Sequence, residues 1–315
     1  MGIAQPLKDL LKRSDTVRRI LDTRAYYMLR QRLVLLTSPR LPQSVFTQFL
    51  RVPTQFEALV GPVLAFLLGD DEQKPLTISV IGSSIGSEPY TIASVLARGR
   101  PDLEFHIHAF DNNPEMVERT RRAQYTADEI WTHPGVTRDF VAGTFSEDDG
   151  RYTVRKNLVA RVQVSLGNIL DPTTLVAACR SDIVFVQNLL FNFKPRVARR
   201  AFANVLALLN SRAVLFIDGM DLGMRQRLTR RAGLTPLLYE IGAIHDEAKV
   251  VRGSWHGCYW SLEPFSDSRR EWARRYGTIF LKGQAAPSAH SASSDTRAQR
   301  PSGPTRPEGR QPQRA

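Results

Sequence analysis

Residues 78–93 constrain the fold more than any other stretch of the chain. They read Ile-Ser-Val-Ile-Gly-Ser-Ser-Ile-Gly-Ser-Glu-Pro-Tyr-Thr-Ile-Ala, so a β-branched apolar run leads into a turn that contains Gly82 and Gly86. Pro89 then stands near a helix start, where its missing N–H does little harm. The stretch predicts a strand, a tight loop and a helix. Such a loop presents unpaired N–H groups and suits a nucleotide-like ligand, although it also serves as a plain connector.

A second strand follows this helix and ends in an acidic residue. Residues 103–110 show strand-like alternation, and Asp111 comes next, 25 residues after Gly86. In a strand–helix–strand unit, a carboxylate at this place can accept hydrogen bonds from both hydroxyls of a ribose. Asp111 also precedes Asn112, Asn113 and Pro114, which read as a helix entry, so a role as helix N-cap is equally open.

Strands alternate with helices through the rest of the chain, with a further helix predicted over residues 198–209. The additional strands are predicted at residues 151–155, 158–166, 182–186, 213–217, 237–244 and 257–262. The first two of these should form a hairpin, and the last two should close the sheet edge as an antiparallel pair. The alternation predicts an α/β fold with a parallel sheet and a ligand above the carboxyl ends of its strands.

Changes of composition along the chain suggest its division into parts. A helical pattern fills the N-terminal region and ends in a polar break at residues 70–75, so we expect a small N-terminal helical domain over residues 1–73. A ligand-binding domain should follow over 74–283, with a β-hairpin insertion at about 138–165. Ser, Pro, Arg, Gln and Gly dominate residues 284–315, which we interpret as a disordered basic tail.

The chain is strongly basic, and most of that charge belongs to the part expected to fold. The formal net charge of its 315 residues is +12, and the tail supplies +3 through five arginines against two acidic residues, which leaves +9. This charge suits an acidic protein partner or substrate, nucleic acid, or ordinary solvated helix faces. We rank nucleic acid last because charge is its only support.

Several classes of site and location are disfavoured by the sequence. Cys179 and Cys258 lie far apart and in no metal or redox spacing, so we expect no metal site and a reducing, cytoplasmic location. No apolar run reaches the roughly 18 residues of a membrane helix, and charged residues stand where a signal peptide would need an apolar core. We therefore expect no membrane insertion, and we expect a monomer.

Four motifs, in order along the chain, carry a resemblance to a known family. Residues 47–51 read Thr-Gln-Phe-Leu-Arg, similar to Thr-x-Phe-Phe-Arg, and residues 86–93 resemble Gly-Glu-Glu-Pro-Tyr-Ser-Ile-Ala. Residues 152–171 resemble a hairpin region that ends in Asn-Leu-Leu-Asp, and residues 188–193 resemble the end of Arg-Asn-Val-x-Ile-Tyr-Phe. These are motifs of the CheR-type S-adenosylmethionine-dependent methyltransferases, which methylate glutamate side chains of chemotaxis receptors. The resemblance covers most of residues 20–265.

The resemblance implies a fold, a cofactor and a set of site residues. The fold would be a Rossmann-like class I methyltransferase sheet with helices on both faces, and the cofactor S-adenosylmethionine. Glu88 would face the amino acid end of the cofactor and Asp111 its ribose. Arg51 would lie near the reacting centre, although a salt bridge at the domain junction is its alternative role. The implied catalytic residues are Arg51, Asn188 and Asn192, and the implied cofactor-binding residues are Thr47, Arg51, Gly82, Gly86, Glu88, Asp111, Asn188 and, at the adenine, Asn168 and Ile169.

Three departures from the family pattern replace a charged or aromatic residue by a smaller or uncharged polar one. Ser87 replaces the first glutamate of its motif, Gln187 replaces the arginine before Asn188, and Asn192 replaces a tyrosine. The last two departures lie on the acceptor side. Two hypotheses follow, a methyltransferase that acts on a protein glutamate or on another acceptor, and a cofactor-binding protein that has lost catalysis.

Overall fold

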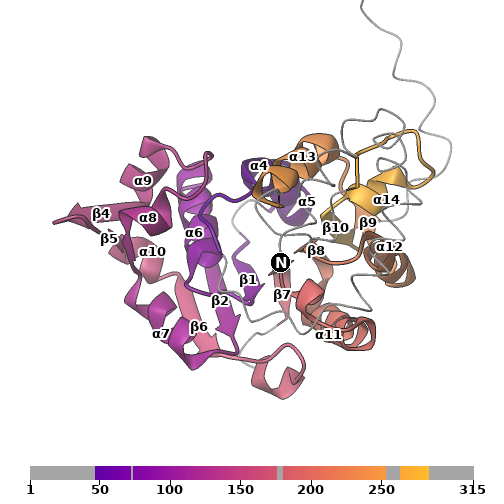
Figure 1. The fold of residues 1–315 in the computed structure, drawn as a ribbon, viewed down its shortest axis with the longest axis horizontal. Coiled ribbons are helices and arrows are strands. Elements are labelled where there is room, and N and C mark those ends of the chain that lie inside the picture. The colour runs from indigo at the N-terminus through magenta and orange to yellow at the C-terminus, as the bar shows by residue number, and fades with distance from the viewer. Residues whose placement is uncertain (1–46, 72–73, 176–179, 253–262, 284–315) are drawn as a thin grey trace, which may run out of the picture. The chain divides into compact units, whose positions relative to one another are not determined.

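A seven-stranded sheet lies at the centre of the described part of the chain, which comprises residues 47–71, 74–175, 180–252 and 263–283 of the computed structural model. Its strands run in the order β6-β2-β1-β7-β8-β10-β9 (Figure 1). The first five are parallel, and β10 is antiparallel to both β8 and β9. The strands are β1 (Leu76–Ile81), β2 (Phe105–Asp111), β6 (Val162–Leu166), β7 (Ser181–Gln187), β8 (Leu209–Asp218), β9 (Thr235–Pro236) and β10 (Ile279–Lys282). This topology confirms the expected Rossmann-like sheet.

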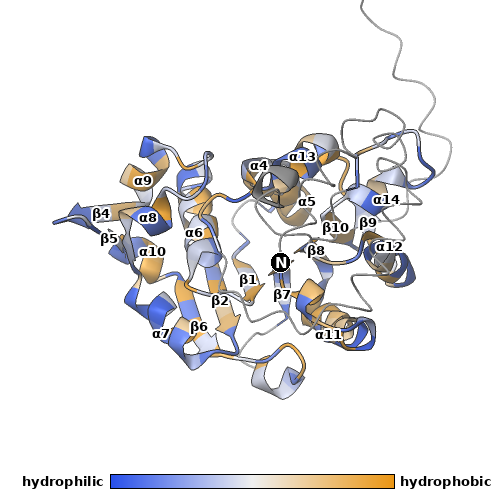
Figure 2. Ribbon diagram, viewed as in Figure 1, coloured by the Kyte–Doolittle hydropathy of each residue, from blue (hydrophilic) through white to orange (hydrophobic). Residues whose placement is uncertain are grey.

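Helices cover both faces of the sheet, as expected. Side chains alternate between the faces, so Ile183 and Phe185 of β7 lie in one core cluster while Val184 and Val186 lie in another. Figure 2 shows hydrophobic residues along β1, β2 and β6 and a largely hydrophilic α7. The first cluster includes residues of α4 (Pro53–Ala58), η1 (Leu59–Val63), α5 (Leu64–Leu68), α6 (Ser87–Gly99), α7 (Pro114–Arg122), α8 (Ala127–Ile130), α9 (Arg138–Thr144), α10 (Lys156–Val159) and α13 (Ile241–Arg252), and the second those of α11 (Pro195–Leu208), α12 (Leu222–Arg231), η2 (Pro172–Leu175) and η3 (Leu190–Asn192).

The loop between β1 and α6 has the shape that the sequence predicts. Gly86 caps the helix with φ of +93°, a conformation that L side chains rarely adopt. A Cβ atom at Gly86 would lie 2.8 Å from a methyl carbon of Thr120 and 2.9 Å from the Tyr125 hydroxyl, so close packing also excludes a side chain. Within α6, the Tyr90 hydroxyl donates to the carbonyl of Thr120 at 2.8 Å, which ties the helix to α7.

The hairpin predicted between residues 151–155 and 158–166 is wrong. Residues 156–159 form α10, and β6 pairs in parallel with β2 at the end of the main sheet. The hairpin instead joins β4 (Phe145–Asp148) to β5 (Arg151–Val154), and β3 (Gln124–Thr126) completes a separate three-stranded sheet. Asp149 and Gly150 have φ of +46° and +72°, the positive values that a two-residue hairpin turn requires.

The strand predicted over residues 237–244 is also wrong, because a helix begins at Ile241. Ile241, Ile244 and Ala248 are buried at helical spacing, and that spacing outweighs the strand-like composition of the segment. The antiparallel edge exists, but β10 forms it with β9 and β8. The other predicted edge strand, at 257–262, lies outside the described residues.

Residues 47–71 pack into the same core as the sheet. Phe49, Leu59 and Leu64 are fully buried in the cluster that also contains Ile78 of β1. A separate N-terminal domain over residues 1–73 stays a prediction, since residues 1–46 lie outside the described part, as does the tail. None of the described helices is both long and apolar enough to cross a membrane.

Candidate functional site

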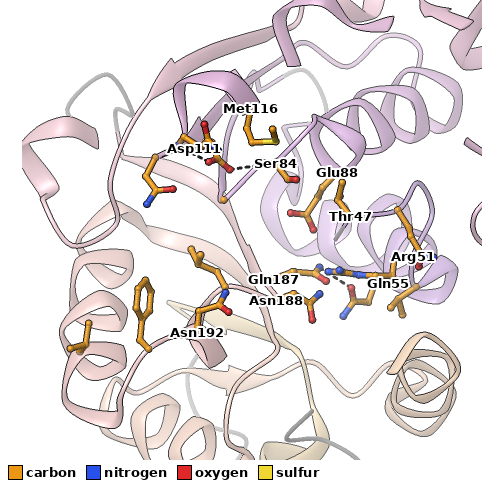
Figure 3. Close-up of a pocket in the computed structure, with 18 of the residues that line it drawn as sticks. Thr47, Arg51, Gln55, Ser84, Glu88, Asp111, Met116, Gln187, Asn188 and Asn192 are labelled. Carbon is orange, nitrogen blue, oxygen red and sulfur yellow. Dashed lines mark hydrogen bonds between the residues drawn. The ribbon is translucent and has the colours of Figure 1, made fainter. Parts of the chain in front are cut away.

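A cavity of about 460 Å³ opens at the carboxyl ends of β1, β2 and β7 (Figure 3). Its volume lies in the range of small-molecule sites, and its position is the one at which α/β sheets bind ligands. Four chain segments line it, with Thr47, Gln48, Arg51, Val52, Gln55, Phe56; Gly82, Ser84, Glu88; Asp111, Asn112, Asn113, Met116; and Gln187, Asn188, Leu189, Asn192, Phe193, Lys194, Val197.

The cavity brings together most of the residues predicted from sequence. The predicted residues that line it are Thr47, Arg51, Gly82, Glu88, Asp111, Asn188 and Asn192. Gly86 does not line it but shapes the start of α6. Asn168 and Ile169 lie in the turn after β6, where the Asn168 side chain accepts from the backbone N–H of Leu170 at 2.9 Å and Ile169 is buried. Their predicted contact with the adenine therefore stays a prediction.

Asp111 lies at the end of β2, and both of its carboxylate oxygens accept backbone N–H groups. Oδ2 accepts from Ser84 at 2.8 Å and Oδ1 from Asn113 at 2.9 Å (Figure 3). The helix N-cap is Asn113, whose side chain accepts from the N–H of Glu115. Since a carboxylate oxygen has two lone pairs, each oxygen of Asp111 can accept one more hydrogen bond. Asp111 therefore holds the glycine loop in place and keeps capacity for a ligand hydroxyl.

Glu88 supplies a second carboxyl group to the cavity. Burial raises its pKa from 4.5 to about 7, and the positive charge of Arg51 acts in the opposite direction. A carboxyl group with this pKa titrates near neutral pH and becomes a stronger partner for a cationic ligand as it ionises. Glu88 and Asp111 together make the interior of the cavity suitable for a ligand that carries both hydroxyl groups and positive charge.

The glycine loop also carries polar atoms that lack partners within the described residues. The hydroxyl oxygens of Ser83, Ser84 and Ser87 are buried and unbonded there. Buried polar groups are normally satisfied, so unpaired hydroxyls beside a cavity are typical of a site that a polar ligand completes. Of these three residues Ser84 lines the cavity, so its hydroxyl is the one that a polar ligand there could reach.

Asn188 is fixed by the ends of two adjacent strands. It has φ of +50°, a left-handed conformation that asparagine tolerates better than most residues. Its backbone N–H donates to the carbonyl of Asp218 at 3.1 Å, and a Cβ atom at Gly219 would lie only 2.5 Å from its Cα. The glycine after β8 therefore allows the turn after β7 that carries Asn188 into the cavity.

A buried chain of amides, which the sequence did not reveal, forms the other wall. Gln187 donates through Nε2 to Oε1 of Gln55 at 2.8 Å (Figure 3). In turn, Nε2 of Gln55 donates to the Thr278 hydroxyl at 2.7 Å. Glu247 of α13 accepts from the backbone N–H of Thr54 at 3.1 Å. These contacts join α4 to β7, to the residue before β10 and to α13. They hold the segment that carries Arg51 beside the cavity.

The described residues contain no group of three His, Cys, Asp or Glu side chains that could hold a metal ion.

The cavity also includes several residues that sequence reasoning did not select, among them Asn112, Met116, Gln55 and Lys194. Asn112 follows the acidic residue directly, and Lys194 follows the last motif by one position. Their proximity to those motifs was the available signal.

Comparison with known proteins gives a family match over the same region. The family described as CheR methyltransferase, SAM binding domain, matches residues 45–228, which is more than half of the chain. The matched region contains every predicted site residue, from Thr47 to Asn192.

Curated relatives and solved structures are more distant. The chain is 29% identical over 195 residues to a probable biofilm formation methyltransferase, WspC, of Pseudomonas putida, which covers 61% of this chain and 44% of that protein. It is 30% identical over 156 residues to a chemotaxis protein methyltransferase of Vibrio parahaemolyticus. This alignment covers 47% of this chain and 55% of that protein. The chain spans about half the length of these relatives. Among solved structures, an O-methyltransferase family protein from Burkholderia thailandensis is 15% identical and has a TM-score of 0.36. The alignment covers 74% of this chain and 63% of that protein's chain.

Proposed function

The chain belongs to the CheR methyltransferase family, through its S-adenosylmethionine-binding domain, and we propose that it transfers a methyl group from this cofactor to a glutamate carboxylate of a protein. The observation that carries the proposal is the convergence of Arg51, Glu88, Asp111 and Asn188 on one cavity. These residues come from four separate segments of the chain; the strand–helix–strand pattern and the family resemblance both selected Asp111, and the resemblance selected the other three. Their meeting supports the roles that the resemblance implies.

The residues of the cavity fit the cofactor. Asp111 keeps free acceptor capacity for ribose hydroxyls, and Glu88 offers a carboxyl group to the cationic amino acid portion. The unpaired hydroxyl of Ser84, which lines the cavity, offers a further polar contact. When bound, the cofactor supplies a methyl group on a positively charged sulfur.

The chain's own residues then have to orient the acceptor. A glutamate carboxylate is already ionised near neutral pH, so its oxygen can attack without a general base. Alignment of the reacting groups and exclusion of water are what remain for the protein to provide. We assign the orientation of the carboxylate to Arg51, because a guanidinium group donates charge-assisted hydrogen bonds to it. Asn188 and Asn192 would line the path on the opposite side.

Incubation of the protein with methyl-labelled cofactor and a lysate from a related bacterium tests the proposal. We expect label on a protein, and we expect mild base to release it, because carboxyl methyl esters hydrolyse readily. Label that resists base would point to an amine acceptor and would contradict a glutamate ester. The variant Arg51→Ala should reduce labelling more than cofactor affinity, whereas the reverse result would argue against its role at the acceptor.

A second candidate function follows from Gln187 and Asn192. Both replace residues of the family pattern on the acceptor side, and Gln187 is engaged in the buried amide chain. A protein of this kind could bind the cofactor and act as a sensor or adaptor without catalysis. Tight binding by calorimetry, together with no transfer to any lysate fraction, would favour this function over the first.

A further inference from the structure

The start of α11 carries a basic surface that the proposed chemistry leaves unused. Lys194, Arg196, Arg199 and Arg200 are all exposed and fall within residues 194–200, a segment without an acidic residue. We call these four side chains the basic rim. None of them forms an ion pair with another residue of the described ranges. Their charge is therefore available to an external partner.

The basic rim begins at the cavity, and one of its four residues lines it. Lys194 lines the cavity, and so does Val197 in the first turn of α11. The exposed residues further along the helix include Ala203 and Ala207, which carry no charge. The positive charge of the helix is therefore concentrated at the end nearest the cavity. The helix dipole adds to it, because the N-terminal end of a helix is its positive end.

The rim also follows the acceptor side of the site in sequence. Asn192, at the position where the family pattern has tyrosine, lies two residues before Lys194, and both line the cavity. One path for a polypeptide that inserts a side chain beside Asn192 runs over the rim, because Lys194 borders the same cavity. An acidic polypeptide is the partner whose charge complements that path.

We propose that the basic rim docks an acidic segment of the substrate protein next to the residue that receives the methyl group. The inference rests on the proposed function and adds to it the recognition of residues beyond the acceptor. The helix rises about 9 Å between Lys194 and Arg200, at about 1.5 Å per residue. An extended chain covers that distance in about three residues. The acidic side chains should therefore lie within about three residues of the acceptor.

The test measures binding of a fluorescein-labelled poly-L-glutamate of about 20 residues to the full chain by anisotropy, with S-adenosylhomocysteine present. The charge reversals Arg196→Glu and Arg199→Glu are made together. Arg227→Glu and Arg231→Glu, two exposed positions on α12 that do not line the cavity, form the matched control pair. We expect the rim pair to weaken binding by at least about tenfold and the control pair by less than about twofold.

An equal loss of binding affinity in the rim pair and in the control pair would overturn the proposal. It would show that net charge alone attracts the polymer. A competition measurement gives a second contrary outcome. If a single-stranded oligonucleotide of equal charge displaces the labelled polymer at a lower concentration than unlabelled poly-L-glutamate does, the surface binds nucleic acid and the proposal is wrong. Labelling of lysate protein is measured separately. If base-labile label forms while the two pairs behave alike, only the docking inference fails. If the pairs differ as expected but no label forms, the proposed function fails.

Discussion

Asp111 has two tasks at the residue scale, and the two can be separated by substitution. Its carboxylate holds the backbone of Ser84 and Asn113, and its remaining lone pairs face the cavity. Asp111→Asn should weaken binding of S-adenosylhomocysteine by about 10-fold to 100-fold, because hydrogen bonds to a charged group contribute about 1.5–3 kcal/mol each. Isothermal titration calorimetry measures the change.

The control for this substitution is Thr137→Ala, at a position that does not line the cavity. It removes the side-chain cap of α9, at a cost of about 1 kcal/mol in folding stability, and leaves the Asp111 carboxylate in place. We expect the affinity of this variant to stay close to that of the natural chain. An equal loss in both variants would show that lower folding stability, and not the carboxylate, weakens binding.

Glu88 should make cofactor affinity depend on pH. Its pKa of about 7 means that about a tenth of the side chains are ionised at pH 6 and about nine tenths at pH 8. If the carboxylate form binds the cationic cofactor, affinity should rise about tenfold across that interval. Calorimetry at the two pH values measures the rise, and Glu88→Gln should abolish it. A rise that survives in Glu88→Gln would assign the titration to another group.

The same pKa has the opposite effect on the stability of the cofactor-free protein. Because the folded-state pKa of Glu88 lies above 4.5, folding favours its protonated form. Its contribution to the free energy of unfolding should therefore decrease as pH rises from about 4.5 to about 7. Urea unfolding of the natural chain and of Glu88→Gln over this interval measures the difference, which should be absent from the variant.

At this scale the sequence predicted the residues that lie in or directly after local motifs. Glu88 and Asp111 follow a strand and a turn that local patterns specify, so their meeting at one sheet edge could be foreseen. Gln55 and Gln187 are separated by 132 positions, and a glutamine on an apolar helix carries no local signal for a partner. Their pairing depends on how α4 docks against β7, which only the tertiary structure determines.

Among the elements, α4 is positioned in part by buried polar contacts. Gln55→Leu should lower the free energy of unfolding by about 1–3 kcal/mol, because it leaves the buried amide of Gln187 and the hydroxyl of Thr278 without a partner. Denaturation in urea measures this loss. The double variant Gln55→Leu with Gln187→Leu removes both amides and should recover part of it. A double variant as unstable as the sum of both single variants would show that the amides do not act as a unit.

The type of an element could be predicted where one hydrophobic period dominated its sequence. The prediction failed where the strand and helix periods competed. The strand at β1 and the helix α6 have clear patterns and glycine punctuation between them. In residues 237–244 the composition favours a strand, but burial of Ile241, Ile244 and Ala248 follows the helical period. The hairpin error has another cause, since Asp149 and Gly150 form the stronger hairpin signal and precede β5, whereas the predicted turn follows it.

For the molecule as a whole, the closing edge of the sheet supports the site from a distance. β10 pairs with β8, and the end of β8 provides the carbonyl of Asp218 and the glycine that fix Asn188. The sequence predicted an antiparallel edge but on other residues, because β10 is only four residues long and its last residue is Lys282. The parallel part of the sheet could be predicted from the alternation of strands and helices. The identity of the edge strand could not, because it depends on which short apolar run pairs with β8.

Arg225 joins these parts and gives the last prediction. It is 1% exposed and forms an ion pair with the carboxylate of Asp218 at 3.2 Å. It also donates a hydrogen bond at 2.9 Å to the carbonyl of Arg275 in α14 (Trp272–Tyr276). Arg225→Met leaves a buried carboxylate without its cation, so it should lower the free energy of unfolding by about 3–5 kcal/mol. The exposed Arg227→Met should change it by less than about 0.5 kcal/mol. Urea denaturation compares the two. Adding Asp218→Asn to Arg225→Met should restore part of the loss, and no recovery would mean that the backbone contacts of Arg225, and not its ion pair, hold the edge of the sheet.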